Sequence, residues 1–380
     1  MITCQNSNIS NRIYVRNNLF CVCVFIFSFL SFNGLGLNPA YLFIATLIFF
    51  TFLIILSRCV ISNVSLVIIS FACLISISQL IAIYYSSAFL NGLSKSVNYI
   101  SWIIFSFSIL YSVSYYEIFK GLSRVNRFFV FKRILFFFVL FLVVELMTRI
   151  IIGDISSGFL YGFKKSLFYF DSNFVGLVVL SFLMLVIYYR NINFPISKVI
   201  VLFLFLLLFF TMSRAAIIAS VISLLVFFKH EGFKSRALFV LFIYILVFTS
   251  LSYFYFSNSN LLSNVDGSFN SKFYIVKQAF LLYSELSMQS LLFGVGLGNF
   301  DKYTDIFAHS IFVTMIIEMG VVGTFLFITF IIYSIHKSNG LSLYIWLPTF
   351  ICGLSLFGVY SPFLFVINAV FILEGQSSGD

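Results

Sequence analysis

The chain has 380 residues, of which 62% are hydrophobic and 9% are charged, and its mean hydropathy is +1.11. This small number of charged residues cannot cover the surface of a soluble globular protein. The composition therefore indicates a polytopic membrane protein. The net charge of +10 is compatible with nucleic-acid binding only if the basic residues form a patch, and their distribution argues otherwise.

About twelve segments are apolar enough to be membrane-spanning helices, at roughly 20 residues per span. They centre on 19–32, 38–57, 60–83, 98–116, 134–152, 172–189, 199–212, 213–228, 237–256, 308–334, 342–358 and 361–373. The predicted fold class is therefore all-α, with one transmembrane helical domain over residues 1–373. The polar tail 374–380, EGQSSGD, breaks this composition and is interpreted as an artificial addition.

The N-terminal apolar run also has features of a signal peptide. Arg12 and Arg16 precede LFCVCVFIFSFLSF, but no small-x-small cleavage site follows and further spans do. We therefore expect an uncleaved first helix.

Basic residues follow the alternation expected of cytoplasmic loops. With the N-terminus inside, the cytoplasmic stretches collect Arg12, Arg16, Arg58, Lys120, Arg124, Arg127, Lys132, Arg133, Arg190, Lys198, Lys229, Lys234, Arg236 and Lys337. Their acidic companions are Glu117, Glu231, Glu374 and Asp380. The excess positive charge is thus interpreted as a topology signal, and no nucleic-acid partner is expected.

Two outer loops are large enough to carry chemistry, residues 153–171 and residues 257–307. The second lies between the ninth and tenth predicted spans, and loops of this length are usually functional or disordered. Its stretch SKFYIVKQAFLLYSELSMQSLLFG is apolar at helical spacing, with Lys272 and Lys277 on the polar side. This pattern predicts a helix along the membrane surface, so any chemistry is expected to face outward.

The stretch FGVGLGNFDKYTDIFAHSIFVTMIIEMGVVG leads from this loop into the tenth span. Gly294, Gly296 and Gly298 allow tight turns. A helix beginning near Ala308 would point its first amides toward outer water, where they favour an anion. A dinucleotide fingerprint is not supported, because no strand precedes the glycines and the last glycine of that motif is missing.

Arg214 and His309 are the two residues of greatest chemical interest. Arg214 stands at the outer end of the eighth span, where it either snorkels to lipid headgroups or clamps a phosphate with its planar guanidinium group. His309 stands at the head of the tenth span. A lone histidine there commonly satisfies a local hydrogen bond, and its functional alternative is a general base.

Other ionisable residues in or near the spans are candidates to line an outward cavity. Glu145 and Arg149 are four residues apart, so they share a helix face, and a structural ion pair is the favoured interpretation. Glu318 has no partner visible in the sequence and is either protonated or directed into the cavity. Lys164 and Lys165 are solvated, face headgroups, or attract an anionic lipid-linked substrate.

An ordered set of motifs over residues 170–335 resembles the O-antigen polymerase and ligase superfamily, and within it the O-antigen polymerases (Wzy). The set comprises Ser213–Arg214, Lys272 in the long loop, the G-x-G-x-G-x-F stretch 294–300, Ala308–His309, and the E-x-G-x-x-G turn 318–323. Two positions depart from the superfamily pattern: Lys272 stands where arginine is common, and Ser310 where asparagine is common. Lysine keeps a charge for phosphate but loses the bidentate geometry of arginine.

The resemblance implies a GT-C-like helical bundle in a bacterial inner membrane and an inverting, metal-independent glycosyl transfer at its periplasmic face. A growing polysaccharide on undecaprenyl diphosphate would be moved to a lipid-linked repeat unit. Arg214 and Lys272 would hold the departing diphosphate, and His309 would accept the proton of the attacking hydroxyl. The implied partners are these lipid-linked glycans, membrane lipids and a chain-length regulator, with no cofactor. The six cysteines show neither zinc nor disulfide spacing.

Two other functions fit the sequence. An O-antigen ligase shares the motifs but delivers polymer to the lipid A–core. A polysaccharide flippase or other transporter is the alternative of another class, although transporters usually show two related halves and no internal repeat is visible here.

Overall fold

A computed structural model describes residues 25–29, 61–90, 96–153, 164–229, 231–257, 267–304, 306–354 and 361–377. Within these ranges six helices are long and apolar enough to cross a membrane: α3 (Asn63–Leu90), α4 (Ser101–Phe119), α5 (Arg124–Ile152), α7 (Ser172–Asn191), α10 (Phe233–Ser257) and α16 (Gly320–Lys337). Four shorter apolar helices accompany them: α8 (Lys198–Phe210), α9 (Arg214–Phe227), α17 (Leu343–Cys352) and α18 (Pro362–Gln376). The chain is an all-α integral membrane protein.

Ten of the predicted spans correspond to these helices, and one of the ten is broken. The segment predicted as one helix over 308–334 consists of α15 (Ile311–Val313), a π-helix η3 (Thr314–Glu318) and α16. The break falls at Gly320, whose φ of 64° no regular helix adopts. The predicted span 38–57, most of 19–32 and most of the loop 153–171 lie outside the described residues.

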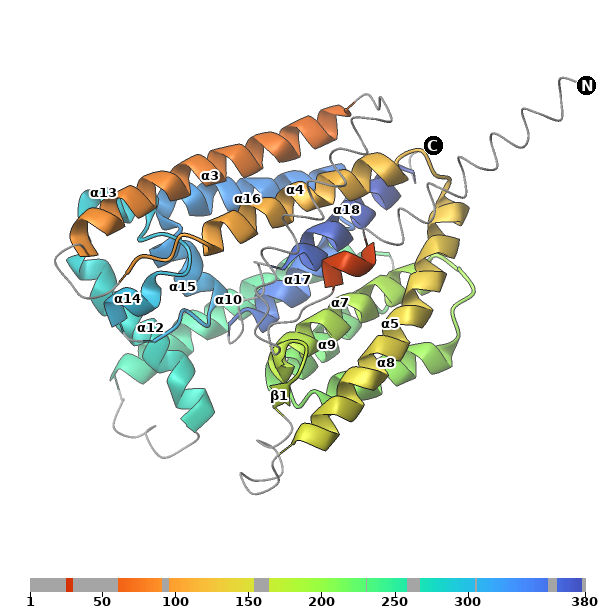
Figure 1. Ribbon diagram of the computed structural model, residues 1–380. Helices are drawn as coiled ribbons and strands as arrows, with labels where there is room; N and C mark the ends of the chain where they lie inside the picture. The colour runs from red at the N-terminus through yellow and green to blue at the C-terminus, as the bar shows by residue number, and fades with distance from the viewer. Residues whose placement is uncertain are drawn as a thin grey trace, which may run out of the picture.

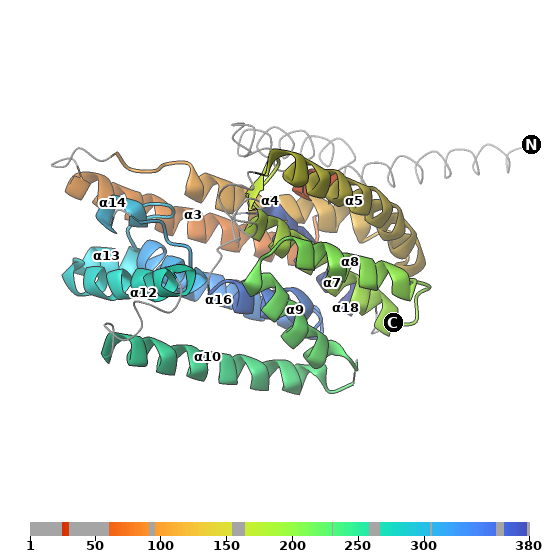
Figure 2. The same ribbon diagram turned by 90° about the horizontal axis from the view of Figure 1, so that it is seen from below.

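The helices form two packed groups (Figures 1 and 2). Helices α3, α4, α16 and α18 form one group, and α7, α8, α9 and α17 form the other, with α5 against α8. Helix α10 contacts α9 and α17 along one side of the bundle and is largely exposed. Two short strands, β1 (Lys165–Ser166) and β2 (Phe170–Asp171), form a hairpin that leads into α7.

Aromatic side chains supply much of the packing between these elements. The Phe138 ring of α5 stacks on the Phe182 ring of α7 with centroids 3.7 Å apart, and Phe227 of α9 stacks on Tyr344 of α17 at 3.9 Å. Aromatic pairs in proteins add roughly 0.5–1.5 kcal/mol to the burial of their rings. The many phenylalanines therefore have a structural use in the core.

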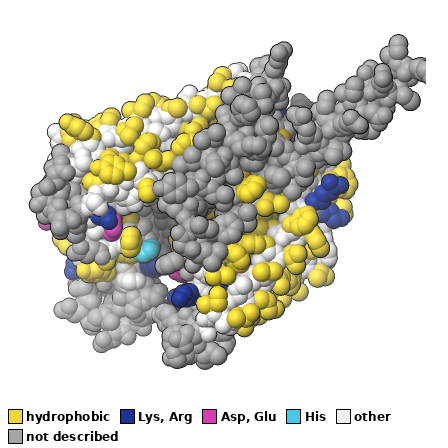
Figure 3. All heavy atoms as spheres, in the orientation of Figure 1, with side chains coloured by type: hydrophobic (Ala, Val, Ile, Leu, Met, Phe, Trp, Pro, Cys, Tyr) yellow, Lys and Arg dark blue, Asp and Glu magenta, His cyan; other side chains and the backbone are white. Residues whose placement is uncertain are grey.

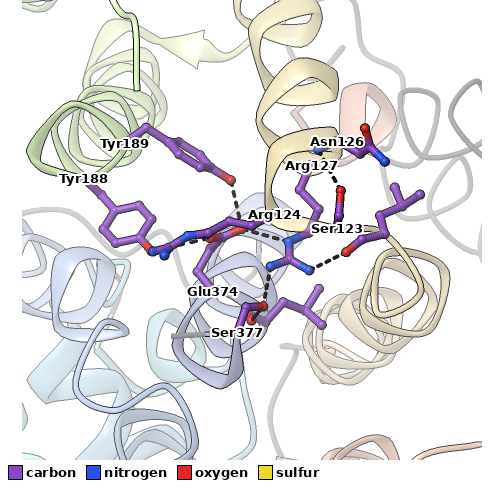
Figure 4. A network of polar contacts seen from close by, with 10 residues as sticks. Ser123, Arg124, Asn126, Arg127, Tyr188, Tyr189, Glu374 and Ser377 are labelled. Atoms are coloured by element: carbon purple, nitrogen blue, oxygen red, sulfur yellow. Dashed lines mark hydrogen bonds and ion pairs between the residues drawn. The ribbon is translucent and has the colours of Figure 1, made fainter. Parts of the chain in front are cut away.

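The helices alternate in direction, which gives the bundle two ends. At one end, which we call the Glu374 end, α5 begins and α7 and α18 finish (Figure 4). The Glu374 carboxylate there pairs with Arg124 Nε at 2.9 Å and Arg127 Nε at 2.8 Å, and Arg124 Nη2 donates to the Tyr188 hydroxyl at 2.8 Å. Glu374 is fully buried inside α18, so the predicted polar tail does not begin at residue 374.

The opposite end, the His309 end, is where α5 finishes and α7 and α9 begin. The described basic residues predicted to be cytoplasmic all belong to helix ends or turns at the Glu374 end, or to the first turns of α5. The charge asymmetry therefore follows the geometry of the bundle. Which end faces the cytoplasm remains a prediction.

Candidate functional site

The glycine-rich loop that precedes His309 is a tightly packed joint. Gly294, Gly296 and Gly298 have φ values of 87°, 87° and 75°, a region that favours glycine. The Val295 amide donates to the Ile317 carbonyl and the Gly296 amide to the Glu318 carbonyl, both at 3.0 Å. These hydrogen bonds tie the loop to the π-helix.

Glu318 completes this joint from the other side. Its side chain is 2% exposed, and its Oε1 accepts a hydrogen bond from the Phe300 amide at 3.1 Å. Helix α3 holds the loop as well, because Ser86 Oγ donates to the Val295 carbonyl at 2.6 Å and Gln79 Oε1 accepts from the Leu297 amide at 2.9 Å. The G-x-G-x-G and E-x-G-x-x-G motifs are thus two halves of one structural contact.

The helix expected near Ala308 begins later, and its first amide is already used. Ser310 is the N-cap of α15, and the Ile311 amide donates to the Gly353 carbonyl at 2.7 Å. The anion-binding helix terminus that the sequence predicted at this position is therefore not supported.

His309 lies just before α15 and its side chain remains exposed to solvent. Partial burial lowers its pKa below the ordinary 6.5, the positive charge of Lys272 lowers it further, and Asp171 acts in the opposite direction. A lowered pKa keeps the imidazole neutral at pH 7, and the neutral form is the one able to accept a proton.

Lys272 of α12 (Gly267–Glu285) is half-buried and feels the same neighbours. Burial lowers its pKa, Asp171 raises it, and Lys164 lowers it. His309, Lys272, Asp171 and Lys164 therefore form one electrostatic cluster drawn from three separate parts of the chain. On the face shown in Figure 3, a histidine and both kinds of charged side chain surround a hollow.

Arg214 is the first residue of α9 and is exposed. The start of α9 packs on the start of α7, because a Cβ built on Gly176 would lie 2.8 Å from Ser213 Cβ. Arg214 thus lies at the same end of the bundle as Asp171, the N-cap of α7. A joint action of Arg214 with the His309 cluster stays a prediction.

Glu145 and Arg149 form the predicted ion pair, with Arg149 Nε 2.9 Å from Glu145 Oε1. Both are at most 1% exposed. Ser166 Oγ donates to Glu145 at 2.8 Å, and Arg149 Nη1 donates to the Phe210 carbonyl at 3.0 Å. The pair connects α5 to strand β1 and to the end of α8. Exposed Lys165 belongs to the same strand, opposite Asp171.

These contacts favour structural roles for Glu145, Arg149 and Glu318. Their use as cavity-lining residues remains a prediction.

Sequence analysis missed Asp171 as a member of the site, although an aspartate directly before an apolar helix is a recognisable N-cap. Its carboxylate accepts from the Asn173 amide at 2.9 Å. Ser172, Ser213, Ser310 and Thr314 are four of the buried hydroxyls that find no hydrogen-bond partner among the described residues. Three of them adjoin Asp171, Arg214 and His309, and such unsatisfied groups are uncommon in folded proteins.

Fold and site together define a multi-pass helical membrane protein with a cluster of ionisable side chains at one end of its bundle. Residues 199–328 match the model of the O-antigen ligase family, which supports membership of the chain in the O-antigen polymerase and ligase superfamily. Members of that family are glycosyltransferase-like enzymes that act on lipid-linked sugars. The matched interval contains Arg214, Lys272, His309 and Glu318. No curated protein matches the chain.

Proposed function

We propose that the protein is an O-antigen polymerase of a bacterial inner membrane. It transfers a growing polysaccharide from undecaprenyl diphosphate to a lipid-linked repeat unit at the periplasmic face, with inversion at the anomeric carbon. The observation that carries this proposal is the placement of exposed His309 in one electrostatic cluster with Lys272 and Asp171. His309 and Lys272 lie inside the matched family interval, and Asp171 lies outside it.

The reaction needs a base and a group that stabilises the departing phosphate. A sugar hydroxyl of the repeat unit attacks the anomeric carbon, its proton passes to His309, and the bond between that carbon and the diphosphate oxygen breaks. Negative charge develops on the diphosphate, where Lys272 and Arg214 stabilise it. The lowered pKa of His309 supports the role of base, because the imidazole enters the reaction unprotonated.

Among the described residues, no group of three or more His, Cys, Asp or Glu side chains gathers to hold a metal ion. Metal independence itself remains part of the proposal.

The ligase function is a second candidate, since the matched model bears the description O-antigen ligase. The two functions differ in the acceptor, which is a lipid-linked repeat for the polymerase and the lipid A–core for the ligase. A flippase would move the glycan without forming a bond. A radiolabelled lipid-linked repeat, followed in vesicles for elongation and for transport, separates both enzymes from a flippase.

The test compares His309→Ala with His336→Ala, a matched control in the last turn of α16 at the Glu374 end. A positioned base contributes typically about 10²–10⁴-fold, so His309→Ala should nearly stop elongation while His336→Ala leaves it intact. Lipopolysaccharide gels give the readout. A polymerase defect leaves the lipid A–core with single repeat units, and a ligase defect leaves bare core. An undiminished ladder at equal protein level would remove His309 from the reaction.

A further inference from the structure

A surface pocket on α5 lies far from the proposed reaction, near the Glu374 end. It has a volume of about 320 Å³ and is lined, among the described residues, by Phe129, Lys132, Arg133, Phe136 and Phe137. These positions have the spacing i, i+3, i+4, i+7 and i+8, so they form one stripe on one face of the helix. Figure 3 shows basic side chains gathered over this part of α5 among hydrophobic ones.

The two cations of this pocket are not neutralised by the part of the chain that the structure describes. Lys132 and Arg133 are exposed and have no ion pair or side-chain hydrogen bond with a described residue. Neighbouring Arg124 and Arg127 on the same helix both pair with Glu374. The pocket therefore presents two unbalanced positive charges, which fit an anionic ligand.

An apolar track continues from the pocket along α5. Phe136 is 70% exposed and Ile151 is 81% exposed, and the side chains between them on the same face are also open. The part of α5 after Arg133 has 19 residues, in which the only charged side chains are the buried pair Glu145 and Arg149. Its length is about 28 Å at 1.5 Å per residue, which matches the hydrocarbon thickness of a bilayer. Lys132 and Arg133 thus stand at the level of the headgroups, and the track below them is at the level of acyl chains.

We propose that this pocket is a binding site for one anionic phospholipid, with its headgroup phosphate on Lys132 and Arg133 and its acyl chains along the exposed face of α5. The aromatic rings of Phe129, Phe136 and Phe137 frame the headgroup above and below the two cations. A zwitterionic lipid fits the same apolar track but gains much less from the charges, because its own cation opposes them.

The experiment places a fluorescent reporter in the pocket with Phe136→Trp. Purified protein is reconstituted in phosphatidylcholine vesicles that carry either brominated phosphatidylglycerol or brominated phosphatidylcholine at equal mole fraction, and bromine quenches the nearby indole. The parent protein, which has two tryptophans of its own, supplies the background. Two basic residues near a headgroup should favour phosphatidylglycerol on the order of 10-fold over phosphatidylcholine.

Three variants in the reporter background make the result specific. Lys132→Gln with Arg133→Gln should bring the quenching by the two lipids to equality. Lys198→Gln with Lys229→Gln removes two exposed charges at the same end outside the pocket and should keep the preference. Lys132→Arg with Arg133→Lys preserves both charges and should also keep the preference for phosphatidylglycerol.

Several outcomes would overturn the proposal. Equal quenching by the two lipids in the reporter protein would exclude selectivity for an anionic headgroup, and an equal loss in the Lys198 and Lys229 variant would reduce the effect to general surface charge. Loss of the quenching by brominated phosphatidylglycerol on addition of inorganic phosphate would identify a site for the free anion. Native mass spectra in which the Lys132 and Arg133 variant loses dimers, but keeps its phosphatidylglycerol adducts, would assign the pocket to a second copy of the chain.

Discussion

The buried ion pair of Glu145 and Arg149 gives the most direct energetic prediction. Arg149→Met would leave the Glu145 carboxylate at 0% exposure, with the Ser166 hydroxyl as its remaining hydrogen-bond partner among the described residues. Removing one member of a buried pair costs roughly 3–5 kcal/mol, because the other charge stays buried without compensation. Glu145→Gln should cost less, about 2–3 kcal/mol. The new side-chain amide can still accept a hydrogen bond from Ser166, and Arg149 still donates one to the Phe210 carbonyl.

The double variant Glu145→Gln with Arg149→Met is the informative one. It leaves no buried charge, so its cost should be well below the sum of the two single costs, with a coupling energy of about 2 kcal/mol or more. Unfolding in mixed micelles, titrated with sodium dodecyl sulfate, measures the three free energies. Ser166→Ala is the matched control and should cost about 1–3 kcal/mol, because it removes the hydrogen bonds of Ser166 Oγ with Glu145 and with the Tyr169 amide but no charge. If the single costs simply add in the double variant, the two side chains do not stabilise each other and the reasoning is wrong.

Four further predictions concern the site and the topology. Arg214→Ala should abolish polymer formation and Arg214→Lys should lose most of it, whereas Lys272→Arg should be tolerated; full activity of Arg214→Lys on gels would reduce Arg214 to a positioning charge. In the pH profile of the polymerisation rate, the acidic limb should lie below pH 6.5. The midpoint of this limb should move to higher pH in Lys272→Ala, which loses a cation, and to lower pH in Asp171→Asn, which loses an anion. Midpoints that stay fixed in both variants would exclude His309 as the titrating base. Gly294→Ala should lower the melting temperature, because a Cβ at Gly294 would lie 2.2 Å from the Glu318 carbonyl oxygen. Gly121→Ala should leave it unchanged, because no heavy atom lies within 4 Å of a Cβ built there. Equal melting temperatures of the two variants would contradict this. An impermeant thiol reagent on intact cells should label a cysteine at 277 and not at 337, and the reverse pattern would invert the topology.

The helices were predictable because each is a local pattern. Apolar runs of sufficient length, bounded by residues such as Asp171 and Ser197 that cap the next helix, mark α7 and α8 in the sequence alone. The i to i+4 spacing likewise predicted the pairing of Glu145 with Arg149, which is confirmed. Local patterns could not reveal the break at Gly320, since the apolar run is continuous across it. The π-helix there depends on hydrogen bonds to the glycine loop, which is distant in space until the chain folds.

The site was less predictable than the helices for the same reason. Asp171 and Lys272 are about a hundred residues apart in the sequence, and their electrostatic interaction arises only from tertiary packing. Glu318 shows the same limit, because the sequence offers no visible partner for a lone carboxylate in a span. The Glu318 carboxylate accepts a hydrogen bond from the Phe300 backbone amide. A backbone partner of this kind cannot be predicted from residue types.

The position of His309 follows from contacts on both of its flanks. On one side the glycine loop is bound to the π-helix and to α3, and on the other side the Ile311 amide is bound to the Gly353 carbonyl at the end of α17. Helix α3 belongs to one packed group of the bundle and α17 to the other, so the segment carrying His309 connects the two groups at their common end. A base on such a segment is held by backbone hydrogen bonds while its side chain stays open to solvent. A site that must admit a sugar hydroxyl needs this combination, because fixed geometry and free access are otherwise difficult to obtain in a packed helical core.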